Sequence, residues 1–413
     1  MAHSWYQGQD DVTGTFLHSP IDHEIFMKQP EGFGDGTGKV ANLLLSLYGI
    51  KQGSHLWNKY MHQKLISHNF ICLLSDHAVY THHTAMGTSV TAIYIDNALT
   101  IASSRAMLAE TCCVLHSLFK MKEEDPDWLM GFKLSDDCKN HTVTITQAQY
   151  TGTLLKRLGM ADCNPVSMPL DPGLVLSKAD CLQTEDERKE MARHLYQEAL
   201  RAITWLAVVS RPNLAYASSQ LGQYSANPGK PHWKALTRVL HYLKGTQDVA
   251  LTLGRVGSTD PDTLTGHTDA SWVNDLDDWR STSGYVFQLG DVAIMWNSKK
   301  QHTIAVLSTE AEYMALSHGA KQVLWLLHDV GLHSTESPST THLSIDNTGT
   351  ITLAKEAHFH AHTKHINMHY HFVCEHIEDG TFKITHVPTM EMLVDRFTKP
   401  LTASGNWGGN DIP

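Results

Sequence analysis

The sequence predicts a protein built from α/β and α+β domains. Strand-like segments whose apolar residues alternate, such as GYVFQLG, are interspersed with helix-like segments such as HLYQEALRAITWLAVVS. Alternation of this kind is typical of sheets covered by helices. The chain has 413 residues, enough for two or three domains with separate cores. Its 42% hydrophobic and 18% charged residues are typical of a folded globular protein.

Residues 1–135 form the first expected region. LWNKYMHQKLISHNF has a helical pattern, SVTAIYIDNALTIASS reads as two strands joined by a turn, and Arg105–Phe119 is expected to be a helix. Asp96 and Asn97 stand between the two apolar strands, and both residue types are favoured in β-turns. From the residues alone, a plain hairpin turn explains this pair.

Residues 136–262 are expected to connect two domains. TVTITQ predicts a short strand, and TGTLLKRLGM predicts a helix that stops near Gly159. The segment NPVSMPLDPG then breaks regular structure with its prolines. Two further helices are predicted, one ending ahead of Pro212 and the other ending at Gly245.

Residues 263–401 are expected to form one compact unit with a flexible, Gly-rich tail at 402–413. A long helix is predicted from about Ser308 to Val330, and EMLVDRFTK is predicted to be a closing helix. The five predicted strands are LTGHTDASW, GYVFQLG, VAIMWNSK, THLSIDN and TFKITHV.

The composition excludes several classes of protein. No segment resembles a signal peptide or reaches the length of a membrane span, so we expect an intracellular protein of the cytoplasm or nucleus. The seven cysteines form no CxxC pair, which argues against a structural zinc site. A net charge of −11 argues against tight non-specific binding of nucleic acid, but it is compatible with a carboxylate cluster that holds metal ions.

Four acidic residues of the last region stand where chain geometry can bring them together. Asp269 lies in the first strand, Glu312 in the first turns of the long helix, Asp346 at the end of the fourth strand and Asp395 in the closing helix. A carboxylate within a strand is uncommon and requires a partner when buried, such as a divalent metal. Unrelated surface and helix-start carboxylates explain the same spacing, and spacing alone leaves both interpretations open.

Five strings of this region resemble, in order and spacing, the RNase H domain of copia-type LTR retrotransposons. They are HTDASWVNDLDDWRSTSGYVF, WNSKKQHTIAVLSTEAEYMAL, SIDNTGTITLAK, HTKHINMHYHFVCEHI and VPTMEMLVDRFTKPL. The resemblance implies an RNase H-like domain: a mixed five-stranded sheet with flanking helices and two Mg²⁺ or Mn²⁺ ions. Carried over residue by residue, it implies Asp269, Glu312, Asp346 and Asp395 as metal ligands and catalytic residues. Glu310 is the alternative at the helix position, and Glu312 is preferred because Tyr-Met-Ala follows it.

Upstream strings resemble the reverse transcriptase of the same elements, so the resemblance covers about residues 9 to 401. DDVTGTFLHSPIDHEIFMKQPEGF places Asp11 at the first metal-binding aspartate, and LLLSLYGIKQGSHLW matches the substrate-positioning motif. YIDN stands where the family has Tyr-x-Asp-Asp, so Asn97 replaces the second aspartate after Asp96. Only ten residues precede Asp11, so we expect a partial palm (1–135) without fingers, a thumb/connection region (136–262) and lost polymerase activity.

The function expected from the resemblance is metal-dependent hydrolysis of RNA in RNA–DNA hybrids, with other retrotransposon Pol chains as further partners. Lys299, Lys300, Lys364 and His365 are the candidate contacts to the hybrid backbone. The histidines between 358 and 376 are interpreted as drift or backbone contacts, with zinc binding as an alternative. Two further alternatives remain: a non-catalytic relic that folds and at most binds nucleic acid or a partner chain, and a polymerase completed by fingers from another chain.

Overall fold

The computed structural model describes residues 5–34, 36–74, 76–137, 139–140, 142–254, 263–329, 340–355 and 367–400. The chain divides into two compact units, Met1–Met130 and Gly131–Pro413. Each unit is described by itself, and the finer division at residue 262 stays a prediction. Among the described residues, no helix has the length and apolar character needed to cross a membrane.

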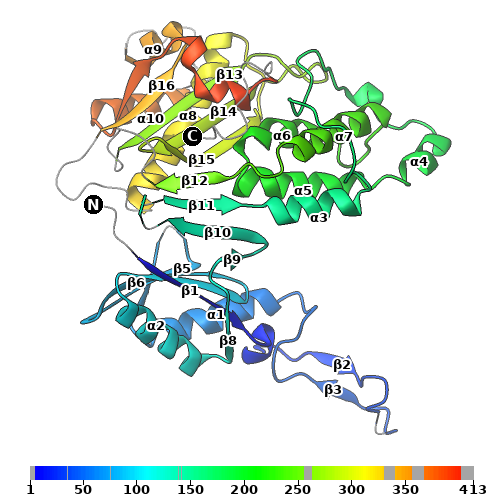
Figure 1. The fold of residues 1–413 in the computed structure, drawn as a ribbon, viewed down its shortest axis with the longest axis vertical. Helices are drawn as coiled ribbons and strands as arrows, with labels where there is room; N and C mark the ends of the chain where they lie inside the picture. Colours follow the sequence, from blue (N-terminus) through cyan, green and yellow to red (C-terminus); the bar gives the residue numbers. More distant parts are fainter. Residues whose placement is uncertain are drawn as a thin grey trace. The chain divides into compact units, whose positions relative to one another are not determined.

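The first unit contains a six-stranded sheet in the order β4-β5-β6-β7-β1-β8, with antiparallel neighbours (Figure 1). The predicted hairpin is present, but its turn is formed by Ile95 and Asp96, and Asn97, which was expected in the turn, is the first residue of β7 and pairs with Tyr94. The strands of this sheet are β1 (Tyr6–Val12), β4 (Phe70–Cys72), β5 (Val79–Thr84), β6 (Gly87–Tyr94), β7 (Asn97–Ala102) and β8 (Met121–Glu124).

Two helices, a separate hairpin made by β2 and β3, and two short elements complete this unit. α1 (Gly53–Ile66) buries Leu56, Trp57, Met61 and Leu65, and α2 (Arg105–Leu118) is capped by the Ser104 side chain, which accepts a hydrogen bond from the Met107 backbone N–H. α2 lies where the sequence predicts it, whereas α1 starts three residues before the predicted helical pattern and ends at Ile66, so that Phe70, the last residue of that pattern, belongs to β4. The remaining elements are η1 (Thr15–His18), β2 (Phe26–Lys28), β3 (Val40–Asn42) and β9 (Trp128–Leu129).

The second unit begins with an antiparallel ladder and a helical layer. The ladder is made by β10 (Phe132–Asp137), β11 (Thr142–Thr146) and β12 (Leu251–Gly254). The predicted helix ends near Gly159, ahead of Pro212 and at Gly245 are matched: the three helices end at Arg157, Val209 and Gly245, because glycine and proline end helices through backbone chemistry. The helices are α3 (Ala148–Arg157), η2 (Lys178–Asp180), α4 (Glu185–Met191), α5 (Tyr196–Val209), η3 (Pro212–Leu214), α6 (Ala215–Gly222) and α7 (Lys230–Gly245).

The same unit contains a mixed five-stranded sheet in the order β15-β14-β13-β16-β17 (Figure 1). β13 pairs antiparallel with β14 and parallel with β16, which places the ends of β13 and β16 near each other. The five predicted strands are therefore present, and the sheet is mixed, as the resemblance implies. Their bounds are β13 (Leu264–Ser271), β14 (Thr282–Leu289), β15 (Val292–Lys300), β16 (Thr341–Ile345) and β17 (Phe382–His386).

Helices pack on both faces of this sheet. α8 (Ser308–Leu324) covers β13 and β14 on one face, where a Cβ at Gly319 would lie 2.4 Å from Thr268 Cγ2, so only glycine allows this approach. α9 (Thr348–Lys355) and α10 (Asn367–Glu378) pack beside α8. On the opposite face η6 (Leu393–Phe397) packs against Gly284 of β14. Asp269, the cross-strand neighbour of Gly284, shares that face.

Two helix predictions need correction. The long helix is α-helical only over Ser308–Leu324 and continues as a π-helical turn, η4 (Trp325–Asp329). EMLVDRFTK is not an α-helix: it contains the 3₁₀ turn η6 and is preceded by a second short 3₁₀ turn, η5 (Thr389–Glu391), which ends at its first residue. Segments this short are held by tertiary packing of residues such as Val394 and Phe397, which are fully buried, and not by helix propensity.

Candidate metal centre and nucleic-acid interface

Three carboxylates meet where β13, α8 and β16 come together. Asp269, Glu312 and Asp346 each offer an oxygen, and these oxygens all lie within 4.8 Å of one another. Asp269 and Glu312 are only 5% and 8% exposed, so bulk water solvates neither carboxyl group well. The tertiary structure thus gathers three of the four acidic residues that the sequence proposes as ligands.

Each of the three carboxylates is also held by a hydrogen bond that orients it. Asp269 Oδ2 accepts from the Thr398 hydroxyl, and Asp346 Oδ2 accepts from Thr389 Oγ1 at 2.8 Å. Glu312 Oε2 accepts from the backbone N–H of Ala270 at 3.1 Å. These bonds leave further lone pairs on every carboxylate, because a carboxylate accepts about four hydrogen bonds.

The rival helix residue Glu310 has a different role. Its Oε2 accepts from the backbone N–H of Val306 at 2.7 Å, which bonds it to the loop that precedes α8. Glu312, two residues later, points to β13 instead. Residues two apart on a helix do not share a face, so only one of the pair can reach Asp269.

Asp395 lies close to the three-carboxylate group but has its own partner. Its Oδ2 forms an ion pair with Lys399 Nζ at 2.8 Å, while its Oδ1 is buried without a hydrogen-bond partner among the described residues. The carboxylate interacts electrostatically with Asp269. The structure therefore places all four acidic residues in one region, with an intramolecular cation beside the fourth.

The electrostatics of the group favour a bound cation. Burial and, to a lesser extent, the nearby Asp269 and Asp346 carboxylates together raise the pKa of Glu312 to about 10. Burial also raises the pKa of Asp269; the Thr398 hydrogen bond lowers it, while Asp395 and Asp346 raise it. Crowded carboxylates of this kind bind protons in the absence of metal, and a divalent ion replaces those protons.

The donor set fits Mg²⁺ or Mn²⁺. Hard divalent ions of this size prefer carboxylate oxygens and water, and the group offers oxygens without thiol or imidazole. The buried Oδ1 of Asp395 gives an additional unsatisfied acceptor next to the group. We therefore treat Asp269, Glu312, Asp346 and Asp395 as the residues that would hold divalent ions.

The polymerase-like residues of the first unit also lie together. Asp11 in β1 stands directly opposite Asn97 in β7. Burial raises the pKa of Asp11, and the carboxylates of Asp96 and Glu124 raise it further. Asn97 donates from Nδ2 to Asp96 Oδ1 at 3.0 Å, so an amide stands beside the aspartate instead of a second carboxylate.

The turn that carries Asp96 has a strained backbone. Ile95 has φ 57°, a conformation that is costly for a β-branched residue, by about 1–3 kcal/mol. Trp57 Nε1 donates to the Ile95 carbonyl at 2.7 Å and supports the turn. This strain was not expected for a plain hairpin turn, in which Asn or Gly would occupy such a position.

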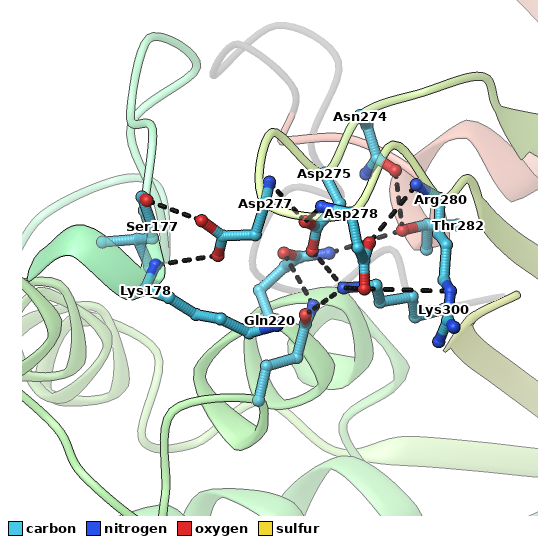
Figure 2. Close-up of polar contacts among 12 residues, drawn as sticks. Ser177, Lys178, Gln220, Asn274, Asp275, Asp277, Asp278, Arg280, Thr282 and Lys300 are labelled. Atoms are coloured by element: carbon cyan, nitrogen blue, oxygen red, sulfur yellow. Dashed lines mark hydrogen bonds and ion pairs between the residues drawn. The ribbon is translucent and has the colours of Figure 1, made fainter. Parts of the chain in front are cut away.

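Lys300, which the sequence proposes as a contact to the hybrid's sugar-phosphate backbone, instead binds side chains of the protein itself (Figure 2). Its Nζ lies 2.5 Å from Asp275 Oδ2 and 2.7 Å from Asp278 Oδ2, and it donates to Gln223 Oε1 at 3.0 Å. Only 17% of its side chain is exposed. Lys299 is exposed and lines a cavity of about 260 Å³ with His302 and Lys321, among others.

The Lys300 network also reaches the helical layer. In the same loop, Asp277 accepts from Ser177 Oγ at 2.7 Å and from the Lys178 backbone N–H at 2.8 Å, which caps η2 (Figure 2). Because these bonds join residues about one hundred positions apart, they tie the connecting segment to the sheet.

Replacing Lys300 by Met is expected to lower the free energy of unfolding by about 2 kcal/mol, because it leaves two carboxylates without their shared cation. Urea unfolding at neutral pH measures the change. Lys299→Met is the matched control, since it removes the same charge from an exposed neighbour and should change stability by less than about 0.5 kcal/mol. Equal effects of the two substitutions would contradict a structural role for Lys300.

The other two candidate contacts, Lys364 and His365, lie outside the described residues, as do His358, His360 and His362. His376, at the end of the same stretch, lies 3.0 Å from Asp379 Oδ2 through its Nδ1. Within the part of the stretch that the structure describes, this histidine therefore contacts the carboxylate that follows α10.

Residues that the sequence reasoning missed surround the carboxylates. Thr398 and Lys399 contact Asp269 and Asp395, and both directly follow the DRF string that drew attention to Asp395. The sequence signal that could have found them is their spacing of three and four residues from Asp395, because residues at this spacing lie about one helical turn from it. Gln301, which follows Lys299 and Lys300 and could have joined them in contacting the hybrid, is buried instead: it donates to Ser283 Oγ at 2.8 Å and to the Ala311 carbonyl at 2.9 Å.

Comparison with known proteins places the chain in a family. A family model described as reverse transcriptase (RNA-dependent DNA polymerase) matches residues 1–172. The Pol polyprotein of transposon TNT 1-94 from Nicotiana tabacum is 34% identical over 399 residues, 95% of this chain. A putative transposon Ty5-1 protein of Saccharomyces cerevisiae is 30% identical over 319 residues, which cover 76% of this chain and 100% of that protein. The chain belongs to the copia-type retrotransposon Pol family.

This Pol chain spans 29% of the length of the tobacco polyprotein. Among solved structures, it is similar to LC11-RNase H1 in complex with an RNA/DNA hybrid, with 11% identity and a TM-score of 0.27. That alignment covers 33% of the Pol chain and 94% of the solved chain. The recognition of retrotransposon Pol from the sequence strings is confirmed.

Proposed function

We propose that this Pol chain hydrolyses the RNA strand of RNA–DNA hybrids through an RNase H-like domain at residues 263–401. The observation that carries the proposal is the convergence of Asp269, Glu312 and Asp346, whose oxygens lie within 4.8 Å of one another. Membership of the Pol family supports it, since reverse transcription produces RNA–DNA hybrids. The preference for RNA would rest on contacts to 2′-hydroxyl groups.

The residues of the site suit phosphodiester hydrolysis. When bound, two Mg²⁺ or Mn²⁺ ions would supply an activated water and stabilise the leaving oxygen. Asp269 and Asp346 would anchor both ions, Glu312 would lie toward the scissile phosphate, and Asp395 would complete the second position. Thr398 and Thr389 orient Asp269 and Asp346 through their hydroxyl groups.

The first unit is proposed to be a reverse transcriptase palm that no longer polymerises, with residues 136–262 as the thumb/connection region. Asn97 donates a hydrogen bond to Asp96, so it places an amide where two ions would require a second carboxylate. Other Pol chains remain proposed partners.

A labelled RNA–DNA hybrid tests the proposal directly. The parent protein is expected to cut the RNA strand in Mg²⁺ or Mn²⁺, and Asp346→Asn is expected to reduce the rate by at least about a thousandfold. Asp291→Asn removes a carboxylate from the β14–β15 turn and serves as the control. If well-folded parent protein cuts in neither metal, the alternative of a non-catalytic relic replaces this proposal.

A further inference from the structure

The ion pair between Asp395 and Lys399 is built into the last 3₁₀ turn. The backbone N–H groups of Thr398 and Lys399 both donate to the Asp395 carbonyl at 3.2 Å, which fixes the turn. This geometry sets Lys399 Nζ 2.8 Å from Asp395 Oδ2. Because the two residues are four apart on one turn, the pair needs no other element to form.

The charge of Lys399 also reaches the neighbouring carboxylates. Asp269 and Asp346 interact electrostatically with Lys399, but the ion pair and the largest interaction are those with Asp395. Asp395 keeps one oxygen, Oδ1, buried and without a hydrogen-bond partner among the described residues. One oxygen of the Asp395 carboxylate is therefore paired with the Lys399 ammonium group, and the other has no hydrogen-bond partner among the described residues.

A second divalent ion would have to enter beside this cation. Two ions in such a site lie about 4 Å apart, so the second already meets strong repulsion from the first. An ammonium group at Asp395 adds one more positive charge at the same place. The three-carboxylate group, in contrast, has no lysine among its hydrogen-bonding partners in the described parts of the chain.

We propose that Lys399 is an internal cation that competes with a second divalent ion for Asp395, so that the site binds its first ion much more tightly than its second. The inference rests on the proposed metal-dependent function. It makes Lys399 a positioning residue that sets how many ions are bound at a given metal concentration. Lys399 itself has no role as a metal ligand, because an ammonium group has no lone pair to offer.

Manganese titration of the full chain tests this directly, with calorimetry for affinity and electron paramagnetic resonance for the number of ions bound. Lys399→Met keeps the length of the side chain and removes its charge. We expect the variant to bind the second ion at least about tenfold more tightly than the parent. Lys399→Arg keeps the charge and should bind as the parent does.

Two controls separate this effect from general changes in charge or folding. Lys234→Met removes a positive charge from an exposed position of α7 and should leave manganese binding unchanged. Manganese that still binds to the Asp269→Asn variant is bound elsewhere, for example by histidines, and its amount is subtracted from the binding measured for the other proteins. The rise in melting temperature on adding Mn²⁺ gives a second readout, expected to be larger for Lys399→Met than for the parent because tighter binding stabilises more.

The outcomes distinguish this inference from the proposed function. If the parent binds ions that Asp269→Asn loses, but Lys399→Met binds the second ion no more tightly, competition by Lys399 is refuted and the metal site stands. If neither protein binds ions that depend on Asp269, both proposals are overturned. Tighter second-ion binding in Lys399→Met and in no control supports the inference.

Discussion

Replacing Glu312 by Gln is expected to stop hybrid cleavage and, at the same time, to stabilise the metal-free protein above neutral pH. Cleavage should fall by at least about a thousandfold, because an amide cannot replace a charged ligand between two carboxylates. The stability gain arises because Glu312 is only 8% exposed and lies against Asp269 and Asp346 without a compensating cation of its own. The residue is thus expected to favour function at the expense of stability.

The sign of the pH dependence follows from the pKa of Glu312. Burial, together with the neighbouring Asp269 and Asp346 carboxylates, raises it to about 10 in the folded protein, from an ordinary value of 4.5. The folded state therefore binds one more proton than the unfolded state between those two values, so stability decreases as the pH rises through this window. The stability contributed by the proton that Glu312 binds is fully present below about pH 4.5 and is lost by about pH 10.

Urea unfolding in EDTA at pH 6 and pH 8.5 measures this effect. The parent should lose stability between the two values, and Glu312→Gln should lose on the order of 3 kcal/mol less. Glu310→Gln is the matched control: it changes the neighbouring glutamate that bonds to Val306 and should retain metal binding. An equally steep pH dependence in Glu312→Gln would show that Glu312 does not hold the proton.

Replacing Gly284 by Ala is expected to destabilise the protein by about 2 kcal/mol and to disturb the site from the opposite strand. A Cβ at Gly284 would lie 2.8 Å from Phe397 Cβ and 2.9 Å from Thr398 Cγ2. Since Phe397 Cβ is attached to the backbone, η6 must move away from the sheet. That movement would take Thr398 from Asp269 and shift Asp395, so hybrid cleavage and metal affinity should both fall by at least about tenfold.

The Gly222→Ala substitution is the control for Gly284→Ala, because it makes the same change at an uncrowded position. Gly222 ends α6, and a Cβ there meets nothing within 4 Å, so the substitution should stabilise the protein by up to about 1 kcal/mol. Chemical denaturation and manganese titration of both variants measure the two effects. Unchanged metal affinity in Gly284→Ala, together with the expected loss of stability, would mean that η6 can move without carrying the carboxylates apart.

Several features could be predicted from sequence because they depend on local chemistry. The ends of α5 and α7 follow from Pro212 and Gly245, and the existence of the hairpin follows from a polar pair between apolar strands, although the turn itself lies one residue earlier, at Ile95 and Asp96. The η5 and η6 turns were mistaken for an α-helix. The residues of η6 have an apolar pattern that suits either form, and η6 packs through Val394 and Phe397 against Gly284, a contact that local sequence does not reveal.

The sequence by itself determined the family, the five strands of the last region and the four acidic positions, since these depend on residue type, order and spacing. Only the tertiary structure decided that Glu312 and not Glu310 approaches Asp269, that Lys399 accompanies Asp395, and that Lys300 is held by Asp275 and Asp278. The physical reason is that charges act through space: whether a carboxylate meets another carboxylate, an ammonium group or a backbone N–H depends on which elements pack together. Burial then determines the strength of each electrostatic interaction, because charges interact more strongly away from water.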